Sequence, residues 1–236
     1  MKALIFRSFF VAIAALSFMT LHAQTADDIV GKYISAIGGK DAIAAVKSVV
    51  MVGTSSVSGF DGNTTITLLV GKGFKTESDF NGQKVIQALT PTSGWGVNAF
   101  IGAPTPTALP AEAVKAGQVQ LQFDPLGNYA ANGLKIELAG KDTADYKIKV
   151  SGGQNTTYYI NQKTYLLDKL TTSVVAMGQQ ADVTLSFSDY RKGDGGTVLV
   201  PYSETIDYPQ ASVAITFKTI TINSTIDPTV FDMPKQ

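Results

Sequence analysis

The stretch that decides the fold is Thr64–Phe80, TTITLLVGKGFKTESDF, in which two alternating runs flank a glycine-containing turn. In the first run, Ile66, Leu68 and Val70 occupy every second position. The second run places Phe74, Thr76, Ser78 and Phe80 on one face and Lys75, Glu77 and Asp79 on the other. A period of two is typical of a β-strand with one buried and one solvated face. Thr64–Phe80 therefore predicts a β-hairpin, and Asn81-Gly82 predicts the next tight turn.

The same period returns along most of the chain. It recurs in Leu134–Leu138, Tyr146–Val150, Val183–Phe187 and Val213–Phe217. Each run has one apolar and one polar face, whereas strands of a parallel sheet are apolar on both faces. The sequence therefore predicts a mainly β protein with an antiparallel meander.

Two short helices are expected before the strands begin. Thr25 can cap a first helix whose first turn carries Asp27 and Asp28, favourable at the positive end of the helix dipole. Gly38-Gly39 is expected to end it. Asp41 is expected to cap a second, shorter helix.

The centre of the chain has a different composition. Thr90–Pro110 is rich in Pro, Thr, Gly and Ala, and Pro110–Leu121 contains helix formers. Asp124-Pro125 has the N-cap and proline pattern of a helix start. We expect a mobile loop and one or two short helices, inserted between two sets of strands. Whether this region covers the sheet as a lid stays open.

The first 23 residues have the pattern of a secretory leader. Lys2 and Arg7 precede a short apolar core, Phe9–Leu16, and the small residue Ala23 marks a plausible cleavage site. The core is shorter than the roughly 20 residues of a membrane-spanning helix. We expect residues 1–23 to be a signal peptide and residues 24–236 to form a single periplasmic domain. With no Cys in the sequence, no lipid anchor is expected.

Composition excludes several kinds of chemistry. The only His, His22, lies in the leader and Cys is absent, so thiol, imidazole and typical zinc chemistry are not expected. The sequence carries 19 Lys and Arg against 19 Asp and Glu, and two of these cations belong to the leader. Such a balance gives no general attraction to nucleic acid. Catalysis by carboxylates alone stays possible in principle, with Glu112 and Glu204 not placed by the pattern, but no enzyme site is recognisable and no cofactor is expected.

Specific segments resemble LolA-like proteins, the outer-membrane lipoprotein-sorting family. These segments are Thr25–Ile43, Tyr158–Leu167, Ser188–Arg191 with Gly196 and Pro201, and Ile226–Pro234. The resemblance implies a strongly curved antiparallel sheet, an unclosed β-barrel, with short helices as a lid over a hydrophobic cavity. In that family the cavity holds acyl chains of a lipoprotein or another lipid. Better-known carriers have an arginine on an early strand, and the corresponding region here has none.

The primary functional prediction is a monomeric periplasmic carrier of lipid or lipoprotein acyl chains, with outer-membrane biogenesis as its setting. Its cavity-lining candidates are Phe74, Phe80, Trp95, Tyr146, Ile148, Leu185, Phe187, Ile215 and Phe217. The same alternation would arise if the apolar face were plain core against helices, without a cavity. The alternative is a non-enzymatic envelope module that senses stress or binds a protein partner through an exposed edge or apolar patch.

Overall fold

A computed structural model describes residues 24–176 and 179–235, so the predicted leader lies outside the described residues. Thirteen strands form one antiparallel sheet in the order β6-β5-β4-β3-β2-β1-β13-β12-β11-β10-β9-β8-β7. Their bounds are β1 (Ser48–Val57), β2 (Phe60–Leu69), β3 (Gly73–Phe80), β4 (Gln83–Leu89), β5 (Gly94–Asn98), β6 (Ala103–Ala108), β7 (Lys135–Lys141), β8 (Asp145–Ser151), β9 (Thr156–Asn161), β10 (Leu167–Ala176), β11 (Gln179–Lys192), β12 (Leu199–Asp207) and β13 (Ser212–Ile222).

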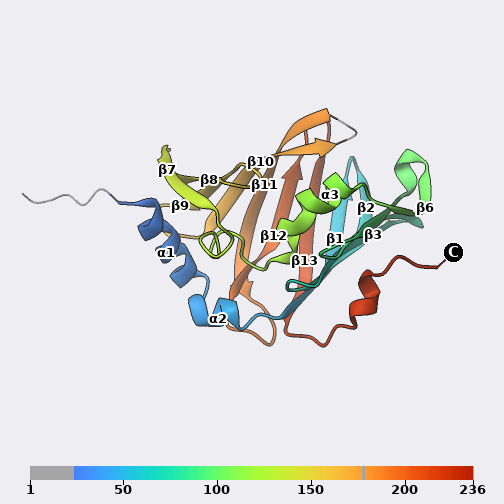
Figure 1. Ribbon diagram of the computed structural model, residues 1–236, viewed down its shortest axis with the longest axis horizontal. Coiled ribbons are helices and arrows are strands. Elements are labelled where there is room, and N and C mark those ends of the chain that lie inside the picture. The colour runs from blue at the N-terminus through green and yellow to red at the C-terminus, as the bar shows by residue number, and fades with distance from the viewer. Residues whose placement is uncertain (1–23, 177–178, 236) are drawn as a thin grey trace, which may run out of the picture.

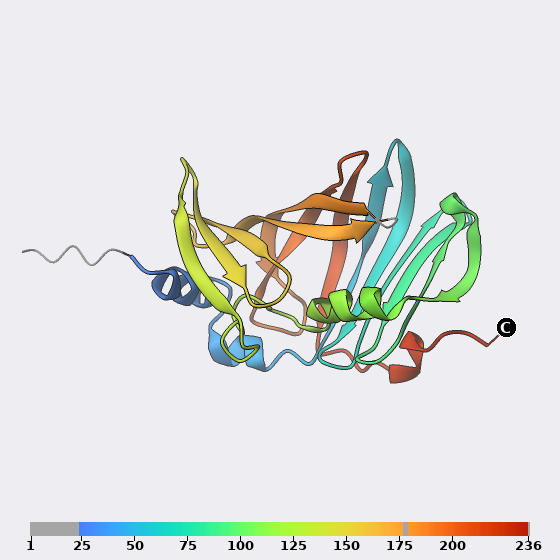
Figure 2. The same cartoon turned by 45° about the horizontal axis from the view of Figure 1, so that its top comes forward.

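The sheet consists of two meanders that meet at one seam. From the seam, where β1 pairs with β13, strands β1 to β6 follow one another toward one edge of the sheet. Strands β13 back to β7 follow one another toward the other edge. The sheet is strongly curved, and its edge strands β6 and β7 do not pair with each other (Figures 1 and 2). The fold class is therefore the predicted one, a mainly β, unclosed barrel with a few helices.

The first helix forms as its sequence predicts. Helix α1 (Ala26–Ala36) begins at a capping box in which the Thr25 side chain accepts from the Asp28 N–H and Asp28 accepts from the Thr25 N–H. The second helix, α2 (Lys40–Ala44), differs from expectation, because Gly39 is its N-cap residue and Asp41 lies in its first turn. Both helices precede β1 and lie at the end of the sheet that carries β7 to β9 (Figure 1).

The centre of the chain departs most from prediction. Thr90–Pro110, expected as a loop, contains β5, the 3-10 helix η1 (Ala99–Ile101) and β6. The predicted helix beyond it is α3 (Ala111–Ala116), followed by the 3-10 helix η2 (Gly117–Leu121). Asp124-Pro125 starts hydrogen-bonded turns and no regular helix.

The segment 109–134 connects the two edges of the sheet. It leaves β6, passes α3 and η2, and enters β7 at the opposite edge. Figure 2 shows α3 lying across the opening between the two arms of the sheet. We call this stretch the crossing segment. No helix among the described residues is long and apolar enough to cross a membrane.

Candidate ligand-binding hollow

Strand register defines the concave face of the sheet. At the seam, Val49, Met51 and Ser55 of β1 pair with Ile222, Ile220 and Ile215 of β13. Lys218 is the extra residue of a bulge there, since Val52 pairs with Thr219 and Gly53 with Phe217. The bulge keeps Phe217 and Ile220 on the same face although three positions separate them.

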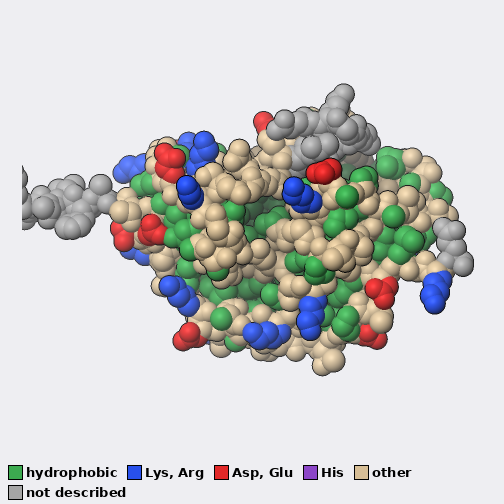
Figure 3. Space-filling view, viewed as in Figure 1, with side chains coloured by type: hydrophobic (Ala, Val, Ile, Leu, Met, Phe, Trp, Pro, Cys, Tyr) green, Lys and Arg blue, Asp and Glu red, His purple; other side chains and the backbone are tan. Residues whose placement is uncertain are grey.

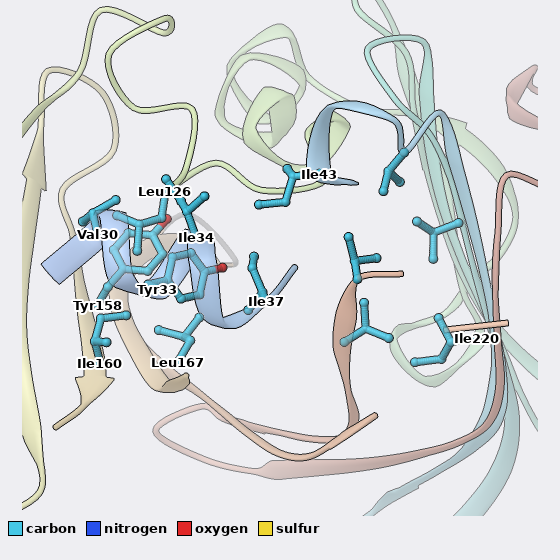
Figure 4. Packing of buried hydrophobic residues seen from close by; sticks show 14 of the residues in the cluster. Val30, Tyr33, Ile34, Ile37, Ile43, Leu126, Tyr158, Ile160, Leu167 and Ile220 are labelled. Carbon is cyan, nitrogen blue, oxygen red and sulfur yellow. The ribbon is translucent and has the colours of Figure 1, made fainter. Parts of the chain in front are cut away.

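Under α1 the concave face is solid core. Ile29, Val30, Tyr33 and Ile34 of α1, together with Ile37 at its C-cap, are buried against side chains of β8, β9 and β10. Figure 4 shows Val30, Tyr33 and Ile34 directed toward Leu126, Tyr158 and Ile160, with Ile220 lying apart on the β13 side. This half of the concave face is filled by α1 and the crossing segment.

The middle of the concave face is less completely covered. Figure 3 views this face and shows a hollow with hydrophobic side chains inside it, in the region where Figure 1 places β11 and β12. Several apolar side chains of this region are only half-buried: Met51, Leu170, Leu185, Phe187, Ile206 and Val213. Register places Leu185 opposite Ile206 and Phe187 opposite Glu204, so neighbouring strands present these side chains on one face.

The sequence-predicted candidates fall into three groups. Phe74, Leu185, Phe187, Ile215 and Phe217 lie on the concave face toward its middle. Ile148 is completely buried beneath α1, and Tyr146 stacks on Tyr165 with ring centroids 6.2 Å apart at the outer end of that helix. The other two candidates, Phe80 and Trp95, are placed elsewhere.

Phe80 ends β3 at a hairpin tip. It is buried against the edge of the Phe100 ring, 5.7 Å between centroids, and a Cβ on Gly62 would lie 2.7 Å from its Cδ1. It shares the concave row of β3 but packs under η1, away from the middle of the sheet.

Trp95 lies on the opposite, convex face. Its register partner is Ala88, which pairs with Lys75, and Lys75 alternates with the concave residue Phe74. The indole N–H donates to the Phe231 carbonyl at 2.8 Å, and Phe231 belongs to the 3-10 helix η3 (Pro228–Phe231). Trp95 therefore holds the C-terminal segment against the outside of the sheet and does not line the concave face.

Replacing Trp95 by phenylalanine should loosen this segment. The change leaves the buried Phe231 carbonyl without its donor, and we expect a loss of about 1–2 kcal/mol in the free energy of unfolding. Urea unfolding measures the loss, and hydrogen exchange should become faster across residues 226–233. Tyr208→Phe, at an exposed aromatic residue, is the matched control. Unchanged exchange at 226–233 in Trp95→Phe would show that the indole bond does not hold the segment.

A buried polar cluster joins α1 to the crossing segment. The Tyr33 hydroxyl donates to Asp124 Oδ1 at 3.2 Å, and the Gly127 N–H donates to the same oxygen at 3.0 Å. Burial raises the pKa of Asp124, and these two hydrogen bonds oppose that rise. A Cβ on Gly127 would stand 2.0 Å from Asp124 Oδ2, so the turn needs glycine at this position. The cluster fixes where the crossing segment lies over the concave face.

Glu204 is the functional candidate that the sequence pattern left unplaced. It follows Val200 and Tyr202 at two-residue spacing on β12, and both of these are buried in the core. Its register partners are Phe187 on β11 and Ile215 on β13. The alternation Val200-Tyr202-Glu204-Ile206 would have identified it as an acid on the apolar face. Burial raises the pKa of Glu204 from 4.5 to about 7.

Other chemistry is sparse on this face. Ser55, Thr64 and Ser78 form a hydroxyl chain across β1, β2 and β3, with oxygens 2.6 and 2.8 Å apart. Across residues 24–176 and 179–235, no group of three or more Asp, Glu, His or Cys side chains is arranged to hold a metal ion. The arrangement as a whole suits an apolar molecule with little polar surface.

Comparison with known proteins gives a fold. No family model matches the chain, and no curated protein matches it. Among solved structures, a DUF1329 family protein from Desulfovibrio piger is 11% identical with a TM-score of 0.57. A LolA superfamily protein from Nitrosomonas europaea is 10% identical (TM-score 0.53), and an outer membrane lipoprotein-sorting protein domain from Vibrio parahaemolyticus is 11% identical (TM-score 0.55).

The likeness extends over most of each molecule. Every one of these three comparisons covers 88% of this chain and 97% of the other chain. At such low identity the similarity concerns the path of the backbone, and it agrees with the resemblance found in the sequence. The chain has a LolA-like fold.

Proposed function

We propose that this protein is a carrier that holds an acyl chain in the hollow of its concave face. The observation that carries the proposal is the row of half-buried apolar side chains around Phe187, on a face that α1 and the crossing segment cover only in part. Each methylene group moved from water into such a site contributes roughly 0.8 kcal/mol. A chain of ordinary lipid length can thus be bound without strong polar contacts.

The cellular setting is part of the same proposal. The leader-like residues 1–23 and the LolA-like fold support export to the periplasm, with residues 24–236 acting as one monomeric domain. A lipoprotein or free lipid is the proposed cargo, and an envelope protein the proposed donor or acceptor. We propose binding in place of catalysis, because His and Cys are absent after Ala23.

A second carboxylate in the hollow, in place of Phe187 opposite Glu204, should weaken binding. For Phe187→Asp we expect the affinity for N-phenyl-naphthylamine, a neutral apolar fluorescent probe, to fall at least about tenfold, since a carboxylate would have to share the apolar site with the probe. Fluorescence titration measures this. Phe60→Asp is the matched control, because Phe60 is 56% exposed at a hairpin tip and lies outside the hollow.

Native mass spectrometry of protein purified from its own envelope gives an independent result. An acyl-bearing adduct on the wild type and on Phe60→Asp, but absent from Phe187→Asp, supports the carrier. Equal probe affinity in all three proteins, together with an unliganded mass, contradicts it. Circular dichroism of each variant separates loss of the site from loss of the fold.

A second candidate is a protein-interaction module, and one observation favours it. Phe60, Phe100 and Ile101 are 56%, 47% and 60% exposed, and the Phe60 and Phe100 rings lie 6.4 Å apart. Apolar side chains grouped at a surface often mark a contact site. A photo-crosslinking residue at position 101 should then give a single envelope-protein adduct in cells, whereas one at exposed Lys163 should not.

A further inference from the structure

Glu204 is an isolated acid in an apolar setting. Its register neighbours are Phe187 and Ile215, and Tyr202 and Ile206 flank it on its own strand at two-residue spacing. No hydrogen bond or ion pair of Glu204 occurs among the described residues. Glu204 is half-buried, and strand register puts it on the concave face of the sheet.

The groups around Glu204 do not offset its charge. Strand register places one cation on the rows of β1, β11, β12 and β13 that surround it, Arg191 opposite Val200, and its guanidinium lies 4.9 Å from the centre of the Tyr202 ring. Arg191 already forms an ion pair with Asp189, which neutralises its charge. On the crossing segment the only cation is Lys115, which is exposed on α3. Tyr190 is the titratable group that interacts with Glu204, and its hydroxyl already donates to the Leu167 carbonyl at 2.8 Å. Tyr190 also interacts electrostatically with the acids Asp168 and Asp124.

An acid in this position favours some ligands over others. An ionised carboxylate in apolar surroundings is costly unless a cation or hydrogen-bond donor joins it. A ligand with its own carboxylate or phosphate beside Glu204 would bring two like charges together. A protonated amine supplies both the opposite charge and three donors, and the resulting charge-assisted hydrogen bond is stronger than one to a neutral hydroxyl.

We propose that Glu204 binds the polar end of the cargo and that this end is a protonated primary amine on a hydrocarbon chain. The proposal rests on the proposed carrier function and adds the chemical class of its ligand. Burial holds the Glu204 pKa near 7, so an amine that binds at neutral pH also displaces a proton from the fraction of protein in which Glu204 is protonated.

The test compares three amphiphiles of equal chain length: dodecylamine, dodecanol and dodecanoate. Each displaces N-phenyl-naphthylamine from wild type, from Glu204→Gln and from Glu77→Gln. The amide of Gln keeps the shape of the side chain, and Glu77 is the matched control because it lies on the convex face in an ion pair with Lys75 at 3.0 Å. For wild type and Glu77→Gln, we expect dodecylamine to bind at least about tenfold more tightly than dodecanol, and dodecanoate most weakly.

In Glu204→Gln the preference for the amine should disappear while dodecanol binds as before. Calorimetry in buffers of different ionisation enthalpy should detect proton release on amine binding to wild type, and none in Glu204→Gln. If all three amphiphiles bind but the amine preference survives in Glu204→Gln, the ligand class is wrong and the carrier function stands. If none of the three binds wild type, both proposals fall.

Discussion

Replacing Gly53 by alanine is expected to lower the free energy of unfolding by about 3 kcal/mol or more, which is roughly 10 °C in melting temperature for a chain of this size. A Cβ at this position would lie 2.1 Å from the Thr216 carbonyl oxygen and 2.7 Å from the Phe217 Cα. Both atoms belong to the backbone of β13, so no side-chain rotation can relieve the contact. The strands themselves must separate.

The position of Gly53 makes this separation costly. It lies at the bulge of the β1–β13 pair, which is the seam between the two meanders of the sheet. Spreading the seam also disturbs the packing of Phe217 and Ile220, which are buried in the main core on either side of the bulge. Thermal and urea unfolding followed by circular dichroism measure the loss.

Gly31→Ala is the matched control, and its effect should have the opposite sign. Gly31 lies within α1, is exposed, and nothing lies within 4 Å of a Cβ built on it. Alanine in a helix is favoured over glycine by roughly 0.5–1 kcal/mol, so this variant should be slightly more stable than wild type. A Gly53→Ala protein as stable as wild type would show that the seam tolerates the spreading that the geometry excludes.

Alternation predicted the strands well where one face is uniformly apolar. Thr64–Phe80 forms β2, a glycine turn and β3 as expected, and the tight turn at Asn81-Gly82 has positive φ at both residues. A buried face requires apolar side chains at every second position, so a strand with one buried face has a two-residue apolar period in its sequence.

The prediction failed at β5 and β6 for an identifiable reason. Gly94 and Gly96 give no side chains to alternate, and Pro104 and Pro106 lie in β6. Proline is tolerated there because β6 is the edge of the sheet, where half of the backbone N–H groups have no strand to bond. Without a visible period, the face of Trp95 was also not predictable, since it depends on the register with β4.

The candidate site could be predicted only in part. The strands that bear Leu185, Phe187, Ile215 and Phe217 are clear from sequence, and so is the face these residues share. What sequence does not contain is how much of that face the helices cover. Ile148 is sealed beneath α1, whereas Phe187 stays half-buried, although both occupy apolar positions in similar alternating strands.

Glu204 gives the second large effect, a stability penalty that depends on pH. The pKa of Glu204 is about 7 in the folded protein against 4.5 without burial. Below pH 4.5 the carboxyl group is protonated in both the folded and the unfolded state, so its burial does not lower the free energy of unfolding through ionisation. Between these values the folded state binds more protons than the unfolded state, so stability falls as pH rises. Above pH 7 the penalty is fully present, at most about 3 kcal/mol.

Glu204→Gln should therefore gain stability over wild type as pH increases from about 4.5 to 7, and the difference should then stay constant. The wild-type profile alone does not isolate this effect, because burial and the neighbouring Asp168 raise the pKa of Asp145 to about 6, and burial raises that of Asp124. Both acids are present in wild type and variant, so subtracting one profile from the other removes their contributions. Urea unfolding at a series of pH values provides the two profiles.

The pH dependence of the stability difference between Glu204→Gln and wild type distinguishes a buried carboxyl group from a merely altered side chain. A mere loss of packing in Glu204→Gln would change the free energy of unfolding by the same amount at every pH. If the difference between variant and wild type does not depend on pH, Glu204 lies in water rather than in the hollow. Glu112→Gln, at an exposed residue of α3, is the matched control. A bound amine should remove the slope from the wild-type profile, because it stabilises the ionised carboxylate in the folded state, and it should leave the slope of the Glu204→Gln profile unchanged. The pH profile and the ligand preference thus test the same carboxyl group by independent measurements.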